Sequence, residues 1–407
     1  MTAPYVPVSE RNLFGYDFGP RQQAVDALAA TLAATAIARD KQGGTALAER
    51  QAIRDSGLLT LRVPGPDGRP AESLPAVLRI VRHLASADSS LAHLFAFQHL
   101  QVETLTLFGT PAQQRRFHEH TAAGWFWGNA TNDRDTRLRL LYENGRYFLD
   151  GERMFCSGSA DSDGLIINVA HPAQAEGRIF LAVPTKRHGI EVLHDWDAIG
   201  QRQTDSGTVR FDRVKVENDE LLGWEPGQPA AARLPRHTLR ACLAQLILAE
   251  IYLGNTEGAL AQGLDYIGQR RRPWPSLGEK AVLEDSLLQL RFGEYWTRYR
   301  GARALTQDAA LALQAAWDRG DALTADERGQ LALEIAQARL SAADAGLHIA
   351  SNIFDQAGAS ATLSSTGLDR YWRNIRVHSL HDPLDHKRVA LGNWLLNGQF
   401  PVPSGYS

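Results

Sequence analysis

The sequence predicts a mainly helical protein with a small β domain in its middle. Apolar residues recur at three- and four-residue spacing up to about residue 125 and again beyond about residue 237, which is the spacing of amphipathic helices. Between these regions the period falls to two, which is typical of strands. We therefore expect an N-terminal helical domain over residues 1–124, a central antiparallel β-barrel over 125–232 and a C-terminal four-helix bundle over 233–407.

The first helical region contains two long apolar patterns and one clear helix start. The patterns cover residues 20–40 and 74–109. At the start of the next segment, Thr110 has the side chain of a helix N-cap and Pro111 occupies the first helical position. These signals predict a short helix after residue 110.

The central region reads as a series of short strands. Residues 138–151 form a predicted hairpin, because Asn144 and Gly145 supply the turn where a positive φ is needed. Further strands are expected at the segments 164–170, 178–184, 190–193 and 207–216. Their even spacing favours a small antiparallel barrel or sandwich.

After a Pro- and Gly-rich linker at 223–236, the helical period returns. Long helices are expected over residues 237–271, 280–318 and 324–357, with a fourth in the C-terminal tail. Thr324 and Glu327 form a capping box that sets the third start. Alanine-rich seams and lengths above about 30 residues favour an antiparallel four-helix bundle.

Composition narrows the class of protein. The chain has 407 residues, 44% hydrophobic and 22% charged, with a net charge of −3 and dispersed arginines. This gives no basic field for nucleic acid and no polybasic membrane patch. Two cysteines fit a reducing compartment, and the N-terminus has no signal-peptide pattern. We expect a cytoplasmic protein that binds neither nucleic acid nor membrane.

Five stretches, in order along the chain, resemble one family: WFWGNAT at 125–131, MFCSGS at 154–159, the segment 194–216, RRPW at 271–274 and DRYWRNIRVHSLHDP at 369–383. They are similar to flavin-dependent monooxygenases of the acyl-CoA dehydrogenase fold, and most similar to dibenzothiophene monooxygenase and related organosulfur monooxygenases. The resemblance runs from about residue 20 to the C-terminus.

The resemblance implies an enzyme with two components. A separate NAD(P)H-dependent flavin reductase would supply reduced FMN, O2 would be the co-substrate, and the oxygenase would be a homotetramer. A flavin C4a-hydroperoxide would pass one oxygen atom to the sulfur of a small hydrophobic compound, as in dibenzothiophene S-oxidation. Such chemistry needs a dry pocket with hydrogen-bond donors placed near the reacting oxygens.

The resemblance also assigns roles to residues. Phe155 would cover the isoalloxazine, Ser157 would lie near N5 and Arg272 would reach the phosphate. A purely structural role is the alternative for each stretch. Ser157-Gly158 is a common turn pair, Trp196 could be a core residue, and arginines are favourable at the C-terminal end of a helix. The expected cofactor-binding set is Asn129, Thr131, Phe155, Ser157, Trp196, Ser206, Arg272 and Gly358.

The substrate side departs from the pattern of the sulfur-oxidising relatives. Phe97, Gln98 and Trp196 are expected to line the substrate pocket. Gln98 stands where dibenzothiophene monooxygenase has histidine, and His99 follows one place later. One residue along a helix rotates a side chain by about 100°, so His99 does not replace it. The loop after Thr131 reads either as a lid over the substrate or as a surface turn.

Three histidines lie close together in the tail: His378, His381 and His386. No HExxH or paired-cysteine motif accompanies them, so we expect no metal site. His378 and His381 would share a face if the segment is helical. The expected catalytic set is His381, Ser157, Asn129 and His378, with His386 structural.

Rival functions remain open at this stage. An acyl-CoA dehydrogenase needs a carboxylate base, and its glutamate position falls on Asp382, which is one methylene shorter. Amine N-hydroxylation would use the same flavin chemistry on nitrogen. A flavin-binding scaffold without turnover has no need of all these polar residues. Cys156 has no neighbour in sequence that would lower its pKa, so it is not expected to be a nucleophile.

Overall fold

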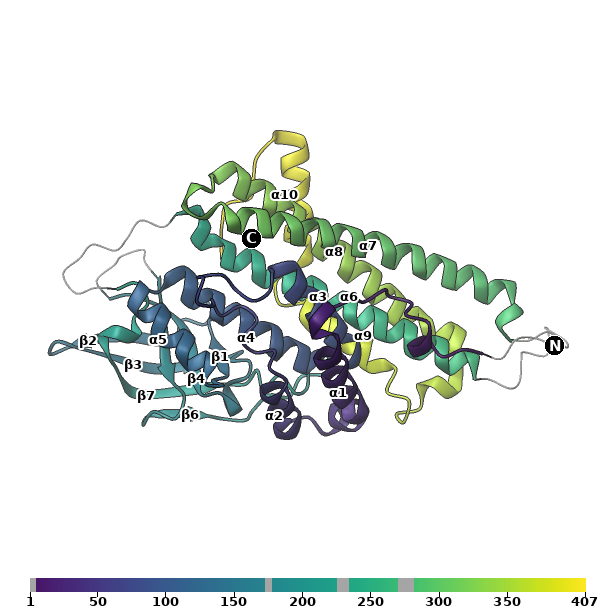
Figure 1. Cartoon of the computed structure of the whole chain (residues 1–407), viewed down its shortest axis with the longest axis horizontal. Coiled ribbons are helices and arrows are strands. Elements are labelled where there is room, and N and C mark those ends of the chain that lie inside the picture. Colours follow the sequence, from purple (N-terminus) through teal and green to yellow (C-terminus); the bar gives the residue numbers. More distant parts are fainter. Residues whose placement is uncertain (1–4, 173–177, 225–233, 270–281) are drawn as a thin grey trace.

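The computed structural model describes residues 5–172, 178–224, 234–269 and 282–407. Two small sheets lie at one end of the molecule, beside the N-terminal helices, and the long C-terminal helices extend away from them (Figure 1). The expected order of helices, β region and helices is confirmed. Within the described residues, no helix is both long and apolar enough to cross a membrane.

The N-terminal region is helical, as expected. The apolar pattern of residues 74–109 forms two helices rather than one, because Asp88 is extended and its side chain accepts a hydrogen bond from the N–H of Leu91 (3.0 Å). Thr110 and Gln113 form a reciprocal capping box at the next helix start. The helices are α1 (Gln22–Gln42), α2 (Leu47–Asp55), α3 (Leu74–Ala87), α4 (Ser89–Phe108) and α5 (Pro111–Ala122).

The β region contains two sheets instead of one antiparallel barrel. One has the order β1-β4-β5 and the other the order β2-β3-β7-β6. β1 and β4 pair in parallel, which corrects the expectation of a wholly antiparallel arrangement. The described strands are β1 (Trp127–Ala130), β2 (Arg139–Glu143), β3 (Arg146–Arg153), β4 (Gly164–Ala170), β5 (Arg178–Pro184), β6 (Ile190–Val192) and β7 (Val209–Val216).

The predicted hairpin is present between β2 and β3. Asn144 and Gly145 have φ values of 50° and 77°, so both turn residues are left-handed as a two-residue hairpin loop of this type requires. Near the other end of β3, Gly151 has φ 115° at a register shift against β7. A Cβ there would lie 2.2 Å from the carbonyl oxygen of Arg137, so no other residue fits.

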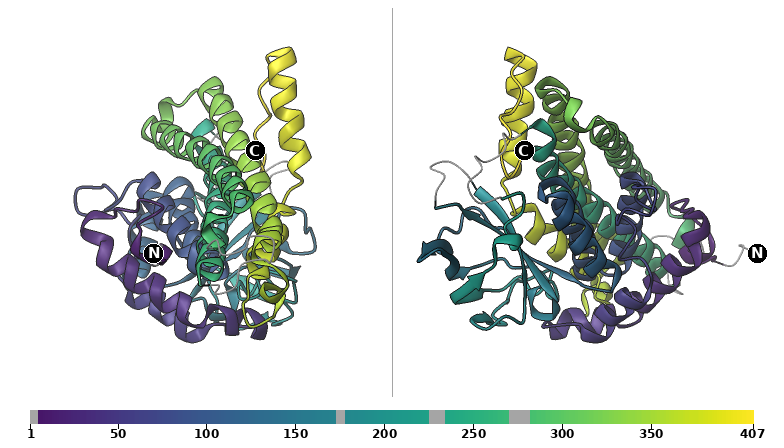
Figure 2. Two further views of the ribbon diagram at one scale, coloured as in Figure 1. Left: turned by 90° about the vertical axis from the view of Figure 1, so that its right-hand side faces the viewer. Right: turned by 60° about the vertical axis from the view of Figure 1, so that its left-hand side comes forward.

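Three long helices follow the β region: α6 (Leu239–Gly268), α7 (Ser286–Asp318) and α8 (Ala325–Ala357). The predicted capping box of Thr324 and Glu327 starts α8. The fourth helix is not continuous, because the chain turns at residues 380–383 and Pro383 begins a new helix. The tail therefore contains α9 (Asp369–Ser379) and α10 (Leu384–Asn397), and α10 projects from the body (Figure 2).

The helical core extends from the N-terminal helices into the C-terminal ones. Buried residues of α3, α4, α6, α7 and α8 form one apolar cluster. α3 and α6 approach closely at Gly254, where a Cβ would lie 2.3 Å from the carbonyl oxygen of Arg82. This shared core fixes α4 against α6, and the site described next lies where these two helices meet the sheets.

Candidate active site

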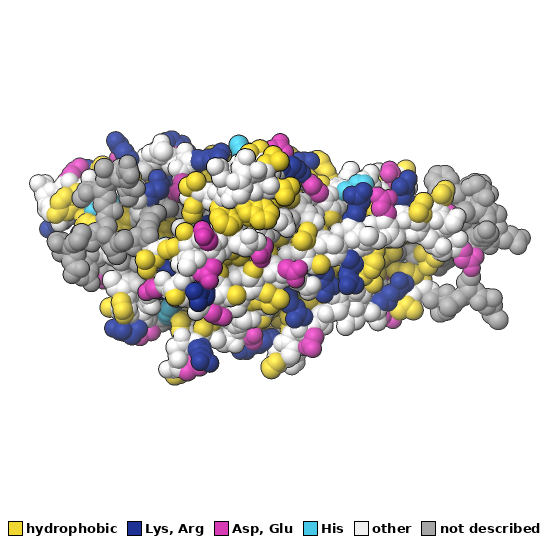
Figure 3. All heavy atoms as spheres, turned by 90° about the horizontal axis from the view of Figure 1, so that it is seen from above, with side chains coloured by type: hydrophobic (Ala, Val, Ile, Leu, Met, Phe, Trp, Pro, Cys, Tyr) yellow, Lys and Arg dark blue, Asp and Glu magenta, His cyan; other side chains and the backbone are white. Residues whose placement is uncertain are grey.

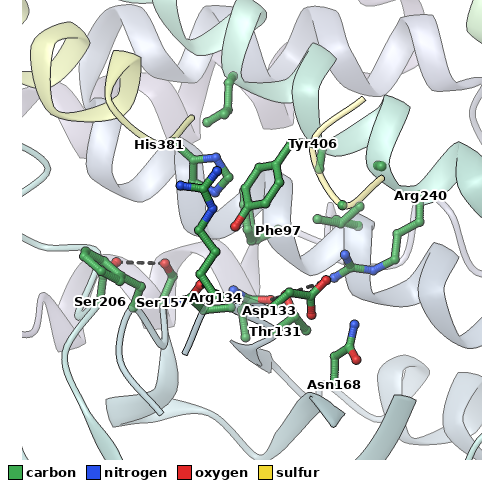
Figure 4. A pocket seen from close by; sticks show the side chains of 18 of the residues that line it. Phe97, Thr131, Asp133, Arg134, Ser157, Asn168, Ser206, Arg240, His381 and Tyr406 are labelled. Carbon is green, nitrogen blue, oxygen red and sulfur yellow. Dashed lines mark hydrogen bonds between the residues drawn. The ribbon is translucent and has the colours of Figure 1, made fainter. Parts of the chain in front are cut away.

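One large pocket, of about 590 Å³, opens between the sheets and the helices. Its walls come from α4, β1, β4, β5, the loop before β7, the first turns of α6, the end of α9 and the C-terminal segment (Figure 4). A pocket of this size accommodates a cofactor ring together with a small substrate. Nine of the residues expected from the sequence line it: Phe97, Asn129, Thr131, Phe155, Ser157, Trp196, Ser206, His378 and His381.

Paired hydroxyl groups occupy one side of the pocket. The Oγ atoms of Ser157 and Ser206 are 2.7 Å apart, and Ser206 Oγ is also 2.7 Å from Thr204 Oγ1 (Figure 4). The N–H of Asn129 donates to the carbonyl oxygen of Ser157 (2.9 Å), which ties the loop after β3 to β1. This places donors and acceptors on a fixed backbone, where they can hydrogen bond to the edge of a planar ligand.

Two aromatic rings stand beside these hydroxyls. Phe155 is 51% exposed although it is a large apolar residue, and its ring centroid lies 6.0 Å from that of Trp196, edge to face. Trp196 is held by its Nε1–H, which donates to the carbonyl oxygen of Gln201 (2.8 Å). Phe155 and Gln201 both have positive φ values, 63° and 53°. Strained backbone of this kind clusters at ligand sites, where the surrounding structure maintains it.

The amide of Asn129 belongs to a hydrogen-bond chain that continues across the pocket wall. Its Oδ1 accepts from Gln101 Nε2 (3.0 Å) and from Thr131 Oγ1 (2.8 Å). With both acceptor positions of Oδ1 filled, the rotamer of Asn129 is fixed. Gln101 was not expected from the sequence, because nothing in the chain pattern pairs α4 with β1.

Three histidines meet at the opposite wall. His93 stacks on Phe97 with ring centroids 4.0 Å apart and lies 4.9 Å from His378, while His381 lines the same pocket. Burial lowers the pKa of His93 to about 3 and, together with the neighbouring histidines, places that of His378 well below its usual value. Both rings are therefore neutral near pH 7, and each can donate one hydrogen bond without carrying charge.

His93 was not among the residues predicted from the sequence. Its position four residues before Phe97 places the two on one face of α4, and this spacing could have identified it. His378 and His381 do not share a helix face, because α9 ends at Ser379. They reach the same pocket from the last turn of α9 and from the turn that follows it. His386 is exposed on α10, outside the pocket.

Gln98 corrects the expected substrate pocket. Its side chain is fully buried, donates to the carbonyl oxygen of Trp125 (3.0 Å) and accepts from the N–H of Trp127 (2.8 Å). Gln98 therefore holds the entry to β1 and does not line the pocket. His99 packs edge to face on Phe95 with centroids 4.8 Å apart, also away from the pocket, as the rotation of about 100° per residue requires.

Asp382 is engaged in a buried ion cluster. Its carboxylate is bound by Arg339 Nη1, lies 3.3 Å from Lys387 Nζ and accepts at 3.5 Å from His381 Nδ1. Burial raises the pKa of Asp382, but the hydrogen bond from His381 and the charges of Arg339 and Lys387 outweigh burial and place it below its usual value. Asp382 does not line the pocket.

The last residues of the chain close one side of the pocket, which the sequence did not reveal. Lys387 Nζ donates to the carbonyl oxygen of Tyr406, and Arg328 donates to that of Ser407. The Tyr406 ring lies 5.7 Å from His381 and beneath the guanidinium of Arg134 at 5.0 Å. The loop that contains Arg134 is also fixed to the protein, because Arg153 Nη1 donates to the carbonyl oxygen of Asn132 (2.7 Å).

The remaining predicted residues lie elsewhere. Gly358 ends α8 with φ 76° and does not line this pocket, and its expected contact with the cofactor stays a prediction. Arg272 lies outside the described residues. Burial raises the pKa of Cys156 to about 12, so its thiol is not activated. Across the described ranges, no three His, Cys, Asp or Glu side chains are placed to share a metal ion.

Comparison with known proteins identifies the family. Residues 246–386 match the family described as "Acyl-CoA dehydrogenase, C-terminal domain". The chain is 42% identical over 381 residues to a probable FMNH2-dependent monooxygenase, SfnC, of Pseudomonas putida, covering 93% of this chain and 95% of SfnC. It is 40% identical over 382 residues to dibenzothiophene monooxygenase of Rhodococcus erythropolis, covering 91% of each chain.

Solved structures of related monooxygenases have the same fold as this chain. The methanesulfinate monooxygenase MsuC from Pseudomonas fluorescens superposes with a TM-score of 0.90 at 42% identity, over 96% of this chain and 100% of MsuC. The FMN-bound dibenzothiophene monooxygenase TdsC from Paenibacillus sp. A11-2 gives 0.89 at 36% identity, over 96% and 100%. The chain belongs to the FMNH2-dependent monooxygenases of organosulfur compounds that have the acyl-CoA dehydrogenase fold.

The residues of the pocket fit the flavin that this family requires. The exposed face of Phe155 next to Trp196 would be covered by a planar ring, and the hydroxyl pair of Ser157 and Ser206 would meet its polar edge. Both ring nitrogens of the buried His93 also have no hydrogen-bond partner among the described residues. Reduced FMN, when bound, supplies the electrons that activate O2, while the chain positions its edge, excludes water and places proton donors.

Proposed function

We propose that the enzyme transfers one oxygen atom from O2 to the sulfur of a small organosulfur compound. The compound has an apolar part and is no larger than dibenzothiophene. The observation that carries this proposal is one pocket in which aromatic side chains, a hydroxyl pair and three histidines face one another. The aromatic residues exclude water and the histidines supply donors, which are the two requirements of oxygen transfer from a reduced flavin.

Each group has a distinct place in this proposal. Ser157 binds the flavin edge near N5, and Asn129 and Thr131 bind its pyrimidine side. His381, on the turn after α9, donates a proton or hydrogen bond at the reacting oxygen. His378 and His93 support it as neutral rings, because burial disfavours a positive charge on either of them.

The rival activities have less support in the site. A dehydrogenase base must point at the substrate, whereas Asp382 is bound by Arg339 and Lys387 outside the pocket. Amine N-hydroxylation would use the same pocket. The nitrososynthase of Micromonospora carbonacea var. africana shares the fold at 20% identity, which carries no information on substrate. We favour sulfur over nitrogen as the acceptor atom because the dibenzothiophene and methanesulfinate monooxygenases are 36–42% identical to this chain, against 20% for the nitrososynthase.

Oxygen transfer can be tested directly. The purified protein, mixed with FMN, NADH, a flavin reductase and ¹⁸O2, should convert an organosulfur compound to a product that carries one ¹⁸O atom, measured by mass spectrometry. The separate reductase is needed because the FMN must arrive reduced. A panel of thiophenes, sulfides, sulfinates and amines defines the acceptor. If reduced flavin reoxidises as in free solution and no panel member gains ¹⁸O, the proposed function is wrong.

We further propose that the protein assembles as a homotetramer through its C-terminal helices. α10 stands away from the body, and Val389, Leu395 and Leu396 on it are 68%, 77% and 81% exposed. Apolar side chains are also visible on this side of the molecule in Figure 3. Apolar residues gathered on a projecting helix mark an interaction surface.

The assembly is tested by charge substitution on α10. Leu395→Asp with Leu396→Asp should reduce the molecular mass in light scattering to that of a smaller species, because two carboxylates would be buried at the interface. Arg388→Gln, on the same helix but exposed and polar, is the control and should leave the mass unchanged. Wild-type protein that is already monomeric at micromolar concentration would contradict the proposal.

A further inference from the structure

Arg240 projects into the pocket from the second residue of α6, far from the histidines along the chain. Figure 4 shows it on the side of the pocket opposite Ser157 and Ser206, with Thr131 and Asp133 between. Its Nε donates to Thr104 Oγ1 (2.8 Å), and Nη2 lies 3.4 Å from Gln101 Oε1 and 3.5 Å from Thr131 Oγ1. Each of these partners is neutral.

The guanidinium also lies over an apolar ring, 4.9 Å from the centroid of Phe180. No carboxylate of the described residues comes within ion-pair distance of it, 4.0 Å. The nearest acidic influence is Asp133, whose Oδ1 lies 3.1 Å from Arg178 Nε. Burial lowers the pKa of Arg240 to about 10, and the charge of Asp133 offsets this only in part. At neutral pH the guanidinium is charged and has no counter-ion of its own among the described residues.

Most charged side chains of the described lining are positive. Arg134, Arg178 and Arg240 line the pocket together with one described carboxylate, Asp133, and the buried His93 and His378 add no positive charge. Arg240 lies opposite Ser157, where the flavin edge is proposed to bind, so a neutral substrate beside Arg240 would leave its charge without a counter-ion in a pocket where charges interact more strongly than in water. An anion bound there would neutralise it.

We propose that Arg240 is the recognition site for the acidic group of an anionic organosulfur substrate, in the first instance a sulfinate. The planar guanidinium donates two parallel hydrogen bonds, which match two oxygens on one sulfur. Thr131 and Gln101 fix the guanidinium, so that it meets the anion in one orientation. This inference rests on the proposed oxygenase function and makes it narrower: the apolar part of the substrate faces the aromatic residues, and its oxyanion faces Arg240.

The reaction balances for this substrate. The lone pair of the sulfinate sulfur takes one oxygen atom of O2, so that R–SO2⁻ becomes R–SO3⁻. Reduced FMN provides the two electrons and two protons that convert the other oxygen atom to water. The negative charge stays on the substrate throughout, so Arg240 remains paired from binding to product and no proton has to leave the substrate.

Binding of a matched pair of compounds tests the proposal. Benzenesulfinate and methyl phenyl sulfoxide differ by one anionic oxygen in place of a methyl group. With FMN-loaded wild-type protein, calorimetry should show benzenesulfinate binding about 10- to 100-fold more tightly, as expected for charge-assisted hydrogen bonds. In Arg240→Gln this preference should disappear, and Arg240→Lys should restore part of it. Arg139→Gln, on exposed β2, is the matched control and should keep the wild-type preference.

Melting temperature and kcat/KM distinguish failure of the proposal for Arg240 from failure of the oxygenase function. Because wild-type Arg240 is an unpaired cation, benzenesulfinate should raise the melting temperature of the wild-type protein and methyl phenyl sulfoxide should not. If Arg240→Gln oxidises both compounds with the wild-type ratio of kcat/KM, Arg240 is not the recognition site although the oxygenase function stands. If wild-type protein oxidises neither these nor any other organosulfur compound, the proposed function itself fails. Equal wild-type affinity for both compounds would also overturn the inference.

Discussion

Replacing His381 with alanine should reduce oxygenation by about 100- to 10,000-fold, the usual contribution of a positioned proton donor. His381 is the histidine of the pocket with the most accessible side chain, 45% exposed, and it lies at the turn where α9 ends. Its removal creates no buried cavity but loses the 3.5 Å contact with Asp382, so the free energy of unfolding should fall by no more than about 1.5 kcal/mol. Product formed per reduced FMN consumed is the measurement, with hydrogen peroxide quantified as the uncoupled product.

The histidine of α10 provides a matched control for this variant. His386 is five residues away and exposed, but it does not line the pocket. His386→Ala should therefore keep wild-type coupling of FMN oxidation to product. Unchanged product formation in His381→Ala would remove this residue from the catalytic role and leave His93 or His378 as the donor.

Replacing Asp382 with asparagine should cost about 3–5 kcal/mol in the free energy of unfolding, because it removes the anion from a buried cluster. Arg339 has a fully buried side chain, and Lys387 is nearly as enclosed; both would keep their charges without a counter-ion. Chemical denaturation monitored by circular dichroism measures this loss. Asp385→Asn is the control, since Asp385 is 89% exposed and its ion pair with Arg388 contributes little.

The pH dependence of stability gives a second test of Asp382. Its pKa in the folded protein lies below the usual value, so its contribution to stability is present above the unfolded pKa of about 4 and is lost as the pH falls below that value. Wild-type protein should therefore lose more stability between about pH 5 and pH 2 than Asp382→Asn does. Parallel curves for the two proteins would show that the carboxylate is not stabilised by its cationic neighbours.

Local signals in the sequence determined much of the fold. The turn at Asn144-Gly145 and the helix starts at Thr110 and Thr324 were predicted because each depends on residues within three positions of one another. The two-residue period of the central strands was equally clear. The parallel pairing of β1 with β4 was not, because strand order depends on contacts between distant segments.

In the candidate site, too, local motifs were predicted from the sequence and long-range contacts were not. Phe155, Ser157 and Trp196 were found because they lie in short stretches that resemble a family, and the structure brings them to one pocket. Gln98 was misplaced because its side-chain direction depends on the packing of α4 against β1. The closing of the pocket by Tyr406 was hidden as well, since it requires the last residues to fold back onto α10 and α8.

The sequence alone determined the order of helices and strands, the family and the reliance on reduced FMN, because these depend on local patterns and contiguous motifs. The tertiary structure decided which side chains share the pocket and which charges lack a partner. Arg240 shows why: in the sequence it is one arginine among many at a helix start, and only the packing of α6 against α4 and β5 leaves its charge in the pocket without a carboxylate within ion-pair distance in the described part of the chain. Long-range packing sets the local dielectric and the partner of each charge, and neither is written in the neighbouring residues.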